Sequence, residues 1–181
     1  GGSMGRGGGA AYVAGRAAGA VGSAGGAAKV DYLLQRCGFD AAFDYRDADI
    51  DAALREHCPR GIDLYFDNVG GSTLEAALRH ANVAARVAVC GMISAYNETH
   101  DPGIRGLQAV LTKRITMTGF IIYDHVHKLS AYQARAAPWL RSGELVFHED
   151  IVQGIEQAPA ALIGMMKGQA IGKRLVQVAP E

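Results

Sequence analysis

The stretch "IDLYFDNVGG", residues Ile62–Gly71, decides the fold, because an apolar strand is followed at once by turn residues. Apolar side chains fill most of its first half, and Asn68 and two glycines end it. The next stretch, "STLEAALRHAN" (72–82), has helical spacing, and Ser72 with Glu75 three residues later predicts a capping box at the start of the helix. A strand, a polar turn and a helix in this order indicate a βαβ unit.

Similar units extend in both directions from this stretch. Further strands are expected at residues 10–15, 41–46, 86–91, 115–123 and 171–178. Helices are expected at residues 30–37, 47–61, 103–114, 126–141 and 154–166. Strands that alternate with helices predict a mostly parallel sheet, and apolar strands predict cover on both of its faces. The predicted fold class is therefore α/β, a Rossmann-like doubly wound sheet that binds ligands beyond the carboxyl ends of its strands.

Composition limits the possible partners. Eighteen basic and eighteen acidic side chains give a net charge of zero, which favours neither nucleic acid nor an anionic membrane surface. The longest apolar run, near residues 118–123, is too short to cross a bilayer. Cys37, Cys58 and Cys90 are widely spaced and odd in number, which fits neither a disulfide framework nor a metal knuckle. We therefore expect a cytoplasmic protein without a metal site.

The glycine-rich stretch "AAGAVGSAGGAAK", residues Ala17–Lys29, raises a question of length. Its first half fits the fingerprint of a dinucleotide-binding turn, with Ala17 in the first glycine place, followed by Gly19 and Gly22. The residue that selects a 2′-phosphate normally follows about 20 residues later, after a helix and a strand. Lys29 follows Gly22 by only seven residues. The sequence therefore predicts a sheet that lacks the first helix and second strand of the usual fold, with a flexible tight turn as the alternative for this stretch.

Four motifs together resemble the zinc-independent medium-chain dehydrogenase/reductase superfamily, namely "GIDLYFDNVGG" (61–71), "CGMISAYN" (90–97), "GFIIYDH" (119–125) and "GQAIGKRLVQV" (168–178). They are most similar to its NADP-dependent alkenal and leukotriene B4 12-hydroxydehydrogenase (prostaglandin reductase) branch. The resemblance implies NADPH as cofactor, an enone or enal substrate whose C=C bond is reduced, and a homodimer joined through edge strands. Such enzymes begin with a GroES-like catalytic domain, which we expect to be absent here. Residues 5–181 are therefore expected to be a truncated NADP-binding domain behind an expression-tag remnant at residues 1–4.

The resemblance also implies roles for residues at the ends of the strands. Lys29 would approach the adenosine 2′-phosphate, Tyr45 would flank that phosphate or the adenine, and Asn68 would touch the nicotinamide half. The residues implied at the pyrophosphate are Gly19, Ala20, Val21 and Gly22. The remaining implied cofactor contacts are Cys90, Gly91, Phe120, Ile121, Ile122, Gly172 and Lys173. Tyr96 is the implied catalytic residue, as a hydroxyl donor to the substrate carbonyl, or else it holds the nicotinamide ribose.

Simpler roles stay open for several of these residues. Tyr96 also fits an ordinary loop position and Asn68 a turn. Lys29 fits a solvated helix start, and Cys90 a small buried hydrophobe. For the whole chain, two further hypotheses stand beside the reductase. One is a non-catalytic module that folds and dimerises, and the other is a quinone oxidoreductase.

Overall fold

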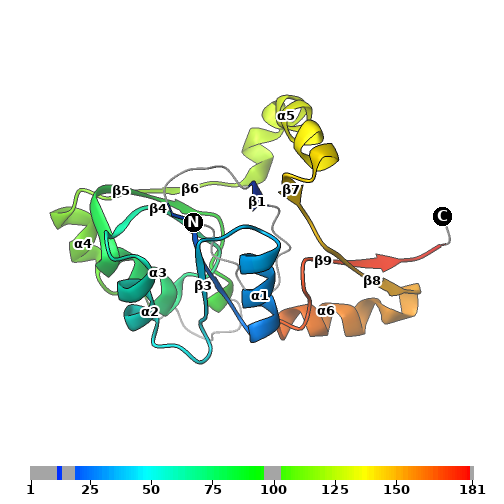
Figure 1. Cartoon of the computed structure of the whole chain (residues 1–181), viewed down its shortest axis with the longest axis horizontal. Helices are drawn as coiled ribbons and strands as arrows, with labels where there is room; N and C mark the ends of the chain where they lie inside the picture. Colours follow the sequence, from blue (N-terminus) through cyan, green and yellow to red (C-terminus); the bar gives the residue numbers. More distant parts are fainter. Residues whose placement is uncertain (1–11, 14–18, 96–102, 180–181) are drawn as a thin grey trace.

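The computed structural model describes residues 12–13, 19–95 and 103–179, in which parallel strands alternate with helices (Figure 1). The strands are β1 (Tyr12–Val13), β2 (Val21–Ala24), β3 (Ala41–Asp44), β4 (Ile62–Asp67), β5 (Ala81–Val89), β6 (Thr116–Gly119), β7 (Leu145–Val146), β8 (Glu149–Gln153) and β9 (Lys173–Gln177). The α-helices are α1 (Ala27–Gln35), α2 (Ile50–His57), α3 (Gly71–His80), α4 (Leu107–Thr112), α5 (Leu129–Ser142) and α6 (Ala158–Met166). The 3-10 helices are η1 (Ile93–Ala95), η2 (Ile122–Lys128) and η3 (Ile155–Gln157).

The strands form four small sheets within the described ranges. β2 pairs with β3, β8 pairs with β9, and β5 lies between β4 and β6, all in parallel, whereas β1 and β7 are antiparallel. In Figure 1, α2 and α3 lie together beneath the β4–β5–β6 sheet, and α6 runs beneath β8 and β9 at the other end of the molecule. The predicted α/β class with mostly parallel strands is confirmed.

No strand among the described residues joins the β2–β3 pair to the β4–β5–β6 sheet. In the doubly wound order 3-2-1-4-5-6, β3 and β2 take the first two places and β4, β5 and β6 the last three. No strand among the described residues pairs with the free edge of β4. Leu64, in the middle of β4, is accordingly 53% exposed. Most of the first predicted strand, residues 10–15, lies outside the described residues, so the lack of the first helix and second strand stays a prediction.

Val21 and Gly22 belong to β2, so the predicted fingerprint turn is wrong. A Cβ atom on Gly22 would lie 2.8 Å from Leu33 Cδ1 of α1 and 3.0 Å from Phe39 Cδ1. Glycine therefore has a packing role in this strand, because it lets the helix and the segment after it approach closely. Gly22 of the predicted fingerprint thus serves close packing, whereas a Cβ atom on Gly19 would have no neighbour within 4 Å.

The main hydrophobic core lies between α3, β5 and the residue before β6. Leu74 and Leu78 of α3 have no exposed surface, and they pack against Ala85, Val87 and Ile115. Full burial of one such leucine stabilises a fold by about 1.5–3 kcal/mol. Two further clusters join α1 to β2, and α2 to β3 and α3. The helices are thus fixed to the strands whose ends form the site.

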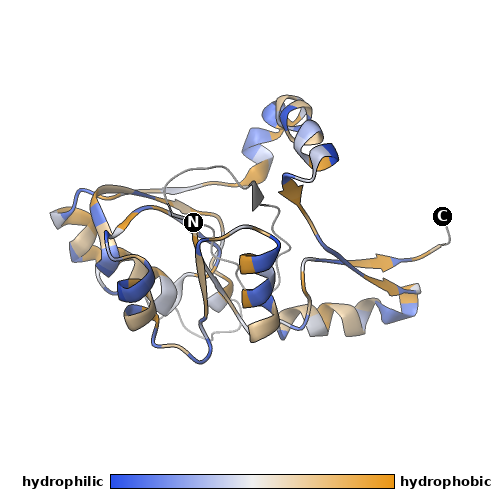
Figure 2. Cartoon of the chain, viewed as in Figure 1, coloured by the Kyte–Doolittle hydropathy of each residue, from blue (hydrophilic) through white to orange (hydrophobic). Residues whose placement is uncertain are grey.

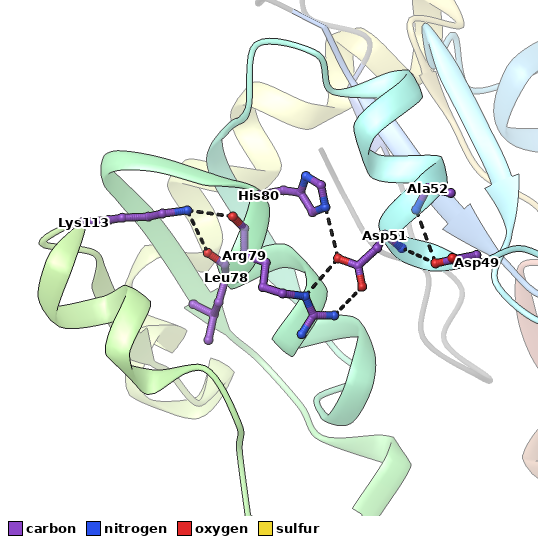
Figure 3. Close-up of polar contacts among 7 residues, drawn as sticks. All are labelled: Asp49, Asp51, Ala52, Leu78, Arg79, His80 and Lys113. Carbon is purple, nitrogen blue, oxygen red and sulfur yellow. Dashed lines mark hydrogen bonds and ion pairs between the residues drawn. The ribbon is translucent and has the colours of Figure 1, made fainter.

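Ionic contacts also join α2 to α3 (Figure 3). Arg79 Nε donates to Asp51 Oδ1 at 2.9 Å, and His80 Nε2 lies 3.1 Å from the same oxygen. The hydrogen bonds from Arg79 lower the pKa of Asp51. Lys113 Nζ donates to the carbonyl oxygen of Arg79 at 2.7 Å, which caps the end of α3, and the Asp49 carboxylate accepts from amides at the start of α2.

The capping box expected at the start of α3 is wrong. The helix begins at Gly71, after Gly70, and no side chain caps it. Glu75, the expected partner, instead accepts a hydrogen bond from the backbone of Arg105 at 2.9 Å through Oε1. This contact ties α3 to the segment before α4.

Several other elements differ in extent from the sequence prediction. β6 ends at Gly119, four residues before the end of the predicted strand, because the chain turns into η2 from Ile122. β5 begins earlier than expected, and β7 and β8 were not predicted. In the part of the chain that the structure describes, no helix has the length and hydropathy needed to cross a membrane.

Hydrophobic residues make up much of β8, α6 and β9 (Figure 2). Ile151 of β8 is 47% exposed, and Leu162 and Ile163 of α6 are 57% and 55% exposed. Apolar surface that gathers in this way is typical of a contact surface.

Candidate functional site

The carboxyl ends of β4, β5 and β6 meet at one edge of their sheet. The last residues of the three strands lie opposite one another in the pairing, namely Asp67, Val89 and Gly119. The chain continues from these ends into Asn68, Cys90 and Phe120. Three of the predicted cofactor contacts therefore follow neighbouring strand ends, as the parallel sheet predicts.

The loops after β4 and β5 are in direct contact. The backbone amides of Cys90 and Gly91 donate to the carbonyl oxygen of Asp67 at 2.8 and 3.2 Å, and Ile93 N donates to the carbonyl oxygen of Asn68 at 3.2 Å. A Cβ atom on Gly91 would lie 3.4 Å from that oxygen of Asn68. Cys90 is exposed, so the alternative interpretation of this residue as a small buried hydrophobe is wrong.

The segment after β6 adds apolar side chains to this edge. Phe120 N donates to the carbonyl oxygen of Val89 at 3.2 Å, and the Phe120 ring lies 6.0 Å from the ring of Phe66 between centroids. Ile121 and Ile122 follow and are 58% and 66% exposed. The edge thus offers apolar surface beside the polar side chain of Asn68.

A second group of predicted residues lies at the carboxyl end of β2. Lys29 is in the first turn of α1, and Tyr45 and Arg46 follow β3. A Cβ atom on Gly25 would lie 2.7 Å from Arg46 Nε and 2.8 Å from the Tyr45 hydroxyl oxygen. One on Gly168 would lie 2.6 Å from Arg46 Nη2 and 3.9 Å from Lys29 Nζ. The two glycines therefore let two cations and a hydroxyl group come together at the β2–α1 turn.

Asp44 shapes this turn. Its Oδ2 accepts from the amide of Gly26 at 2.8 Å, and its Oδ1 accepts from the amide of Arg46 at 3.0 Å. One carboxylate thus fixes the backbone at the start of α1 and the backbone that carries the arginine.

The carbonyl groups at the end of α6 hold the two cations. Lys29 Nζ donates to the carbonyl oxygen of Gly168 at 2.5 Å, and Arg46 Nη2 donates to that of Lys167 at 3.4 Å. Burial lowers the pKa of Lys29, and the nearby guanidinium of Arg46 lowers it further. An anion bound beside both groups would relieve this repulsion, because an opposite charge favours the protonated form of the lysine.

The residues implied at the pyrophosphate do not join this group. Gly19 and Ala20 precede β2 and lie at its amino end, where Ala20 N donates to Asp40 Oδ2 at 2.6 Å. Val21 and Gly22 lie within the strand. None of the four lies at the carboxyl end of β2, where the chain turns into α1. This placement corrects the sequence prediction.

Three further predicted residues lie apart from both groups or cannot be placed. Gly172 and Lys173 stand at the start of β9, where Lys173 N donates to the carbonyl oxygen of His148 at 2.7 Å. Tyr96, the predicted catalytic residue, lies outside the described residues. Sequence reasoning missed Arg46, although its position at the end of the predicted strand 41–46 was a signal for a ligand contact.

Comparison with known proteins identifies the family. Residues 7–140 match the zinc-binding dehydrogenase family. The chain belongs to this family. Within the described residues of the chain, no group of three or more histidine, cysteine or acidic residues is placed to hold a metal ion.

Relatives of the chain include several reductases. The 2-alkenal reductase (NADP(+)-dependent) of Nicotiana tabacum is 45% identical over 162 residues, which are 89% of this chain and 47% of the relative. The NADPH-dependent curcumin reductase of Escherichia coli (strain K12) is 39% identical over 165 residues, which are 88% of this chain and 48% of the relative. The chain thus spans about half the length of the curated relatives it matches. The predicted resemblance to NADP-dependent alkenal and enone reductases is confirmed.

Solved structures confirm the fold of the chain. CurA from Vibrio vulnificus, in complex with NADPH, superposes with a TM-score of 0.83 at 38% identity, over 89% of this chain and 50% of CurA. The Escherichia coli quinone oxidoreductase complexed with NADPH superposes with a TM-score of 0.72 at 18% identity, a likeness that shows the fold alone. The Rossmann-like class predicted from the sequence is therefore confirmed.

Proposed function

We propose that this chain is the cofactor-binding part of an NADPH-dependent reductase that reduces the C=C bond of α,β-unsaturated aldehydes or ketones. The identity with a 2-alkenal reductase and a curcumin reductase supports this reaction class. The choice of NADPH as cofactor rests on one observation, namely that Lys29, Arg46 and the Tyr45 hydroxyl group lie close together at the β2–α1 turn. NADPH differs from NADH by the 2′-phosphate on the adenosine ribose, an anion that suits two neighbouring cations.

The two groups of residues would hold opposite halves of the cofactor. Arg46 presents a planar fork of donors and Lys29 a compact charge, and both suit the phosphate oxygens. Asn68 and Phe120, at the ends of β4 and β6, would meet the nicotinamide half. When bound, NADPH supplies the hydride for the substrate. Tyr96 would donate a hydrogen bond to the substrate carbonyl oxygen, where negative charge develops during the reduction.

Binding of adenosine 2′,5′-bisphosphate and adenosine 5′-monophosphate to the purified chain tests the phosphate site, because the two nucleotides differ only in the 2′-phosphate. We expect the bisphosphate to bind about 100-fold more tightly, since each hydrogen bond to a charged group contributes about 1.5–3 kcal/mol. The double variant Lys29→Ala/Arg46→Ala should lose this preference. Arg55→Ala, which removes an exposed cation from the last turn of α2, should keep it. Equal affinity of the unsubstituted chain for both nucleotides would contradict the proposal.

The reaction class needs a separate test, namely oxidation of NADPH by the protein that carries this chain in the presence of a 2-alkenal or a quinone. We expect the alkenal to be consumed with formation of the saturated aldehyde. Consumption of the quinone alone would favour the quinone oxidoreductase. Binding of NADPH without turnover of either compound would favour a non-catalytic module.

We also propose that the protein is a homodimer joined through β6 and that it acts in the cytoplasm without zinc. The outer edge of β6 has no strand partner among the described residues, and free edges with β-branched residues suit pairing across a two-fold axis. Free cysteines at positions 37, 58 and 90 suit a reducing compartment. Light scattering after size-exclusion chromatography tests the dimer, and a monomer at high concentration would contradict it. Turnover that falls after treatment with a zinc chelator would contradict zinc independence.

A further inference from the structure

Asp67, at the carboxyl end of β4, has a fully buried carboxylate. Its Oδ1 accepts from the amides of Val69 at 2.9 Å and Gly70 at 3.0 Å and from the Tyr65 hydroxyl group at 3.2 Å. Its Oδ2 accepts from the Gly70 amide at 3.2 Å. A buried carboxylate destabilises a fold unless donors surround it. These donors come from the strand and from the loop that follows it, so the carboxylate ties the loop to its own strand.

The loop after β5 holds the same segment from its other side. Ile93 N donates to the carbonyl oxygen of Asn68, and Ser94 Oγ donates to that of Val69 at 2.6 Å. The carbonyl oxygen of Asp67 accepts from the two amides that follow β5. Asn68 therefore stands between two sets of hydrogen bonds, one from the buried carboxylate and one from the neighbouring loop.

The backbone of this loop has an unusual shape. Gly70 and Gly71 have φ values of +70° and +53°, in the region that favours glycine. A Cβ atom on Gly70 would lie 3.3 Å from the Met92 side chain. The carboxylate of Asp67 gathers two consecutive amides at the entrance to this bend, as aspartate does in tight turns. It thus sets the direction in which the chain leaves the edge of the sheet.

We propose that Asp67 is a positioning residue for cofactor binding, which holds Asn68 where it meets the nicotinamide half of NADPH. This inference rests on the proposed function. Asp67 has no exposed surface and does not touch the cofactor itself. It acts through the loop, so loss of its carboxylate weakens binding of the nicotinamide half and leaves the adenosine 2′-phosphate half unchanged.

The ratio of two dissociation constants isolates this role. Titration of the purified chain with NADPH and with adenosine 2′,5′-bisphosphate gives the affinity gained from the nicotinamide half. In the Asp67→Asn variant an NH2 group replaces a carboxylate oxygen and faces the Gly70 amide, so two hydrogen-bond donors oppose each other. We expect this variant to lower the affinity for NADPH about tenfold, the equivalent of one lost hydrogen bond, and to change the affinity for the bisphosphate by less than about twofold.

Two more variants complete the experiment. Asp63→Asn alters an exposed carboxylate near the amino end of the same strand, which accepts from Asn82 Nδ2 at 2.9 Å, and should change neither affinity. Tyr65→Phe removes one donor to Asp67 and leaves both amide contacts. We expect Tyr65→Phe to lower the affinity for NADPH about threefold. This variant tests the role of Asp67 if Asp67→Asn does not fold. Circular dichroism of each variant reports its folding.

The outcomes separate this inference from the proposed function. An unsubstituted chain that binds neither ligand overturns both. A chain that binds both ligands, with a ratio unchanged in Asp67→Asn or, where that variant is unfolded, in Tyr65→Phe, overturns the role of Asp67 alone. An equal loss of affinity for both ligands in a folded variant also overturns it, since that result indicates a general structural role.

Discussion

Gly22 offers a sharp test of the structure, because the two interpretations of the glycine-rich stretch predict different results for Gly22→Ala. If the residue formed a phosphate-binding turn, the substitution would weaken cofactor binding and leave stability nearly unchanged. In the structure Gly22 is buried within β2, and a Cβ atom there would lie 2.8 Å from Leu33 Cδ1 and 3.0 Å from Phe39 Cδ1 and Cε1. The substitution should therefore destabilise the fold.

The magnitude follows from the neighbours of Gly22. Leu33 has no exposed surface and Phe39 is 8% exposed, so neither side chain can move freely away from a new methyl group. Overpacking of this kind destabilises a core by about 1–3 kcal/mol. Alanine also restricts the unfolded chain, which offsets about 0.4–1 kcal/mol of that loss. The expected net decrease in the free energy of unfolding is about 1–2 kcal/mol.

Urea unfolding followed by circular dichroism measures this decrease as a lower midpoint at unchanged slope. The melting temperature should fall by about 2–8 °C, as expected for a chain of this size. Gly119→Ala is the matched control, because Gly119 also lies in a strand and a Cβ atom there would have no neighbour within 4 Å. If Gly22→Ala and Gly119→Ala are equally stable, the placement of Gly22 in a packed strand is wrong.

Two further substitutions test the contacts between helices and strands. Asp51→Asn should lower the free energy of unfolding at pH 7 by about 0.5–1 kcal/mol, since its pair with Arg79 is partly exposed and screened by solvent. Because Arg79 lowers the pKa of Asp51 in the folded state, this stabilisation is present above the pKa of the unfolded chain and is lost as pH falls through the folded value. Unfolding curves that differ between the two proteins equally at pH 7 and at pH 2 would contradict this reasoning. Leu78→Ala should destabilise the fold by about 2–5 kcal/mol, whereas Leu111→Ala, at a side chain that is 78% exposed, should change stability by less than about 0.5 kcal/mol. A similar effect of both leucine substitutions on the urea midpoint would show that the core lies elsewhere.

The part of the site at the ends of β4 and β5 could be predicted from the sequence. The apolar run of β4 stops before Asn68 and the predicted strand 86–91 ends just after Cys90, and parallel strands bring such ends to one edge. The end of β6 before Phe120 was not predicted, because apolar residues continue to Tyr123. The position of Lys29 near a helix start could also be predicted from the sequence, because Gly25 and Gly26 precede it. These features depend on local pattern and on the strand direction that follows from it.

The glycine-rich stretch could not be assigned from its pattern. Glycine serves equally in a turn that approaches phosphate and in a strand on which a helix packs closely. Gly22 fits the second use only because Leu33 and Phe39 pack on it, and these contacts belong to the folded chain.

Long-range contacts account for the other differences. Lys29 donates to the carbonyl oxygen of Gly168, 139 residues away, and no local signal predicts that contact. Glu75 has the spacing of a capping box, but its carboxylate accepts from Arg105 instead. Tertiary contacts thus replaced a local hydrogen bond that the sequence pattern alone favours.

The most direct test of the proposed function is the difference between the dissociation constants of NADPH and NADH, measured by isothermal titration calorimetry of the unsubstituted chain. The two cofactors differ only in the 2′-phosphate, which we place beside Lys29 and Arg46. We expect NADPH to bind about 100-fold more tightly than NADH, as two hydrogen bonds to charged groups imply. Equal dissociation constants for the two cofactors would contradict the account.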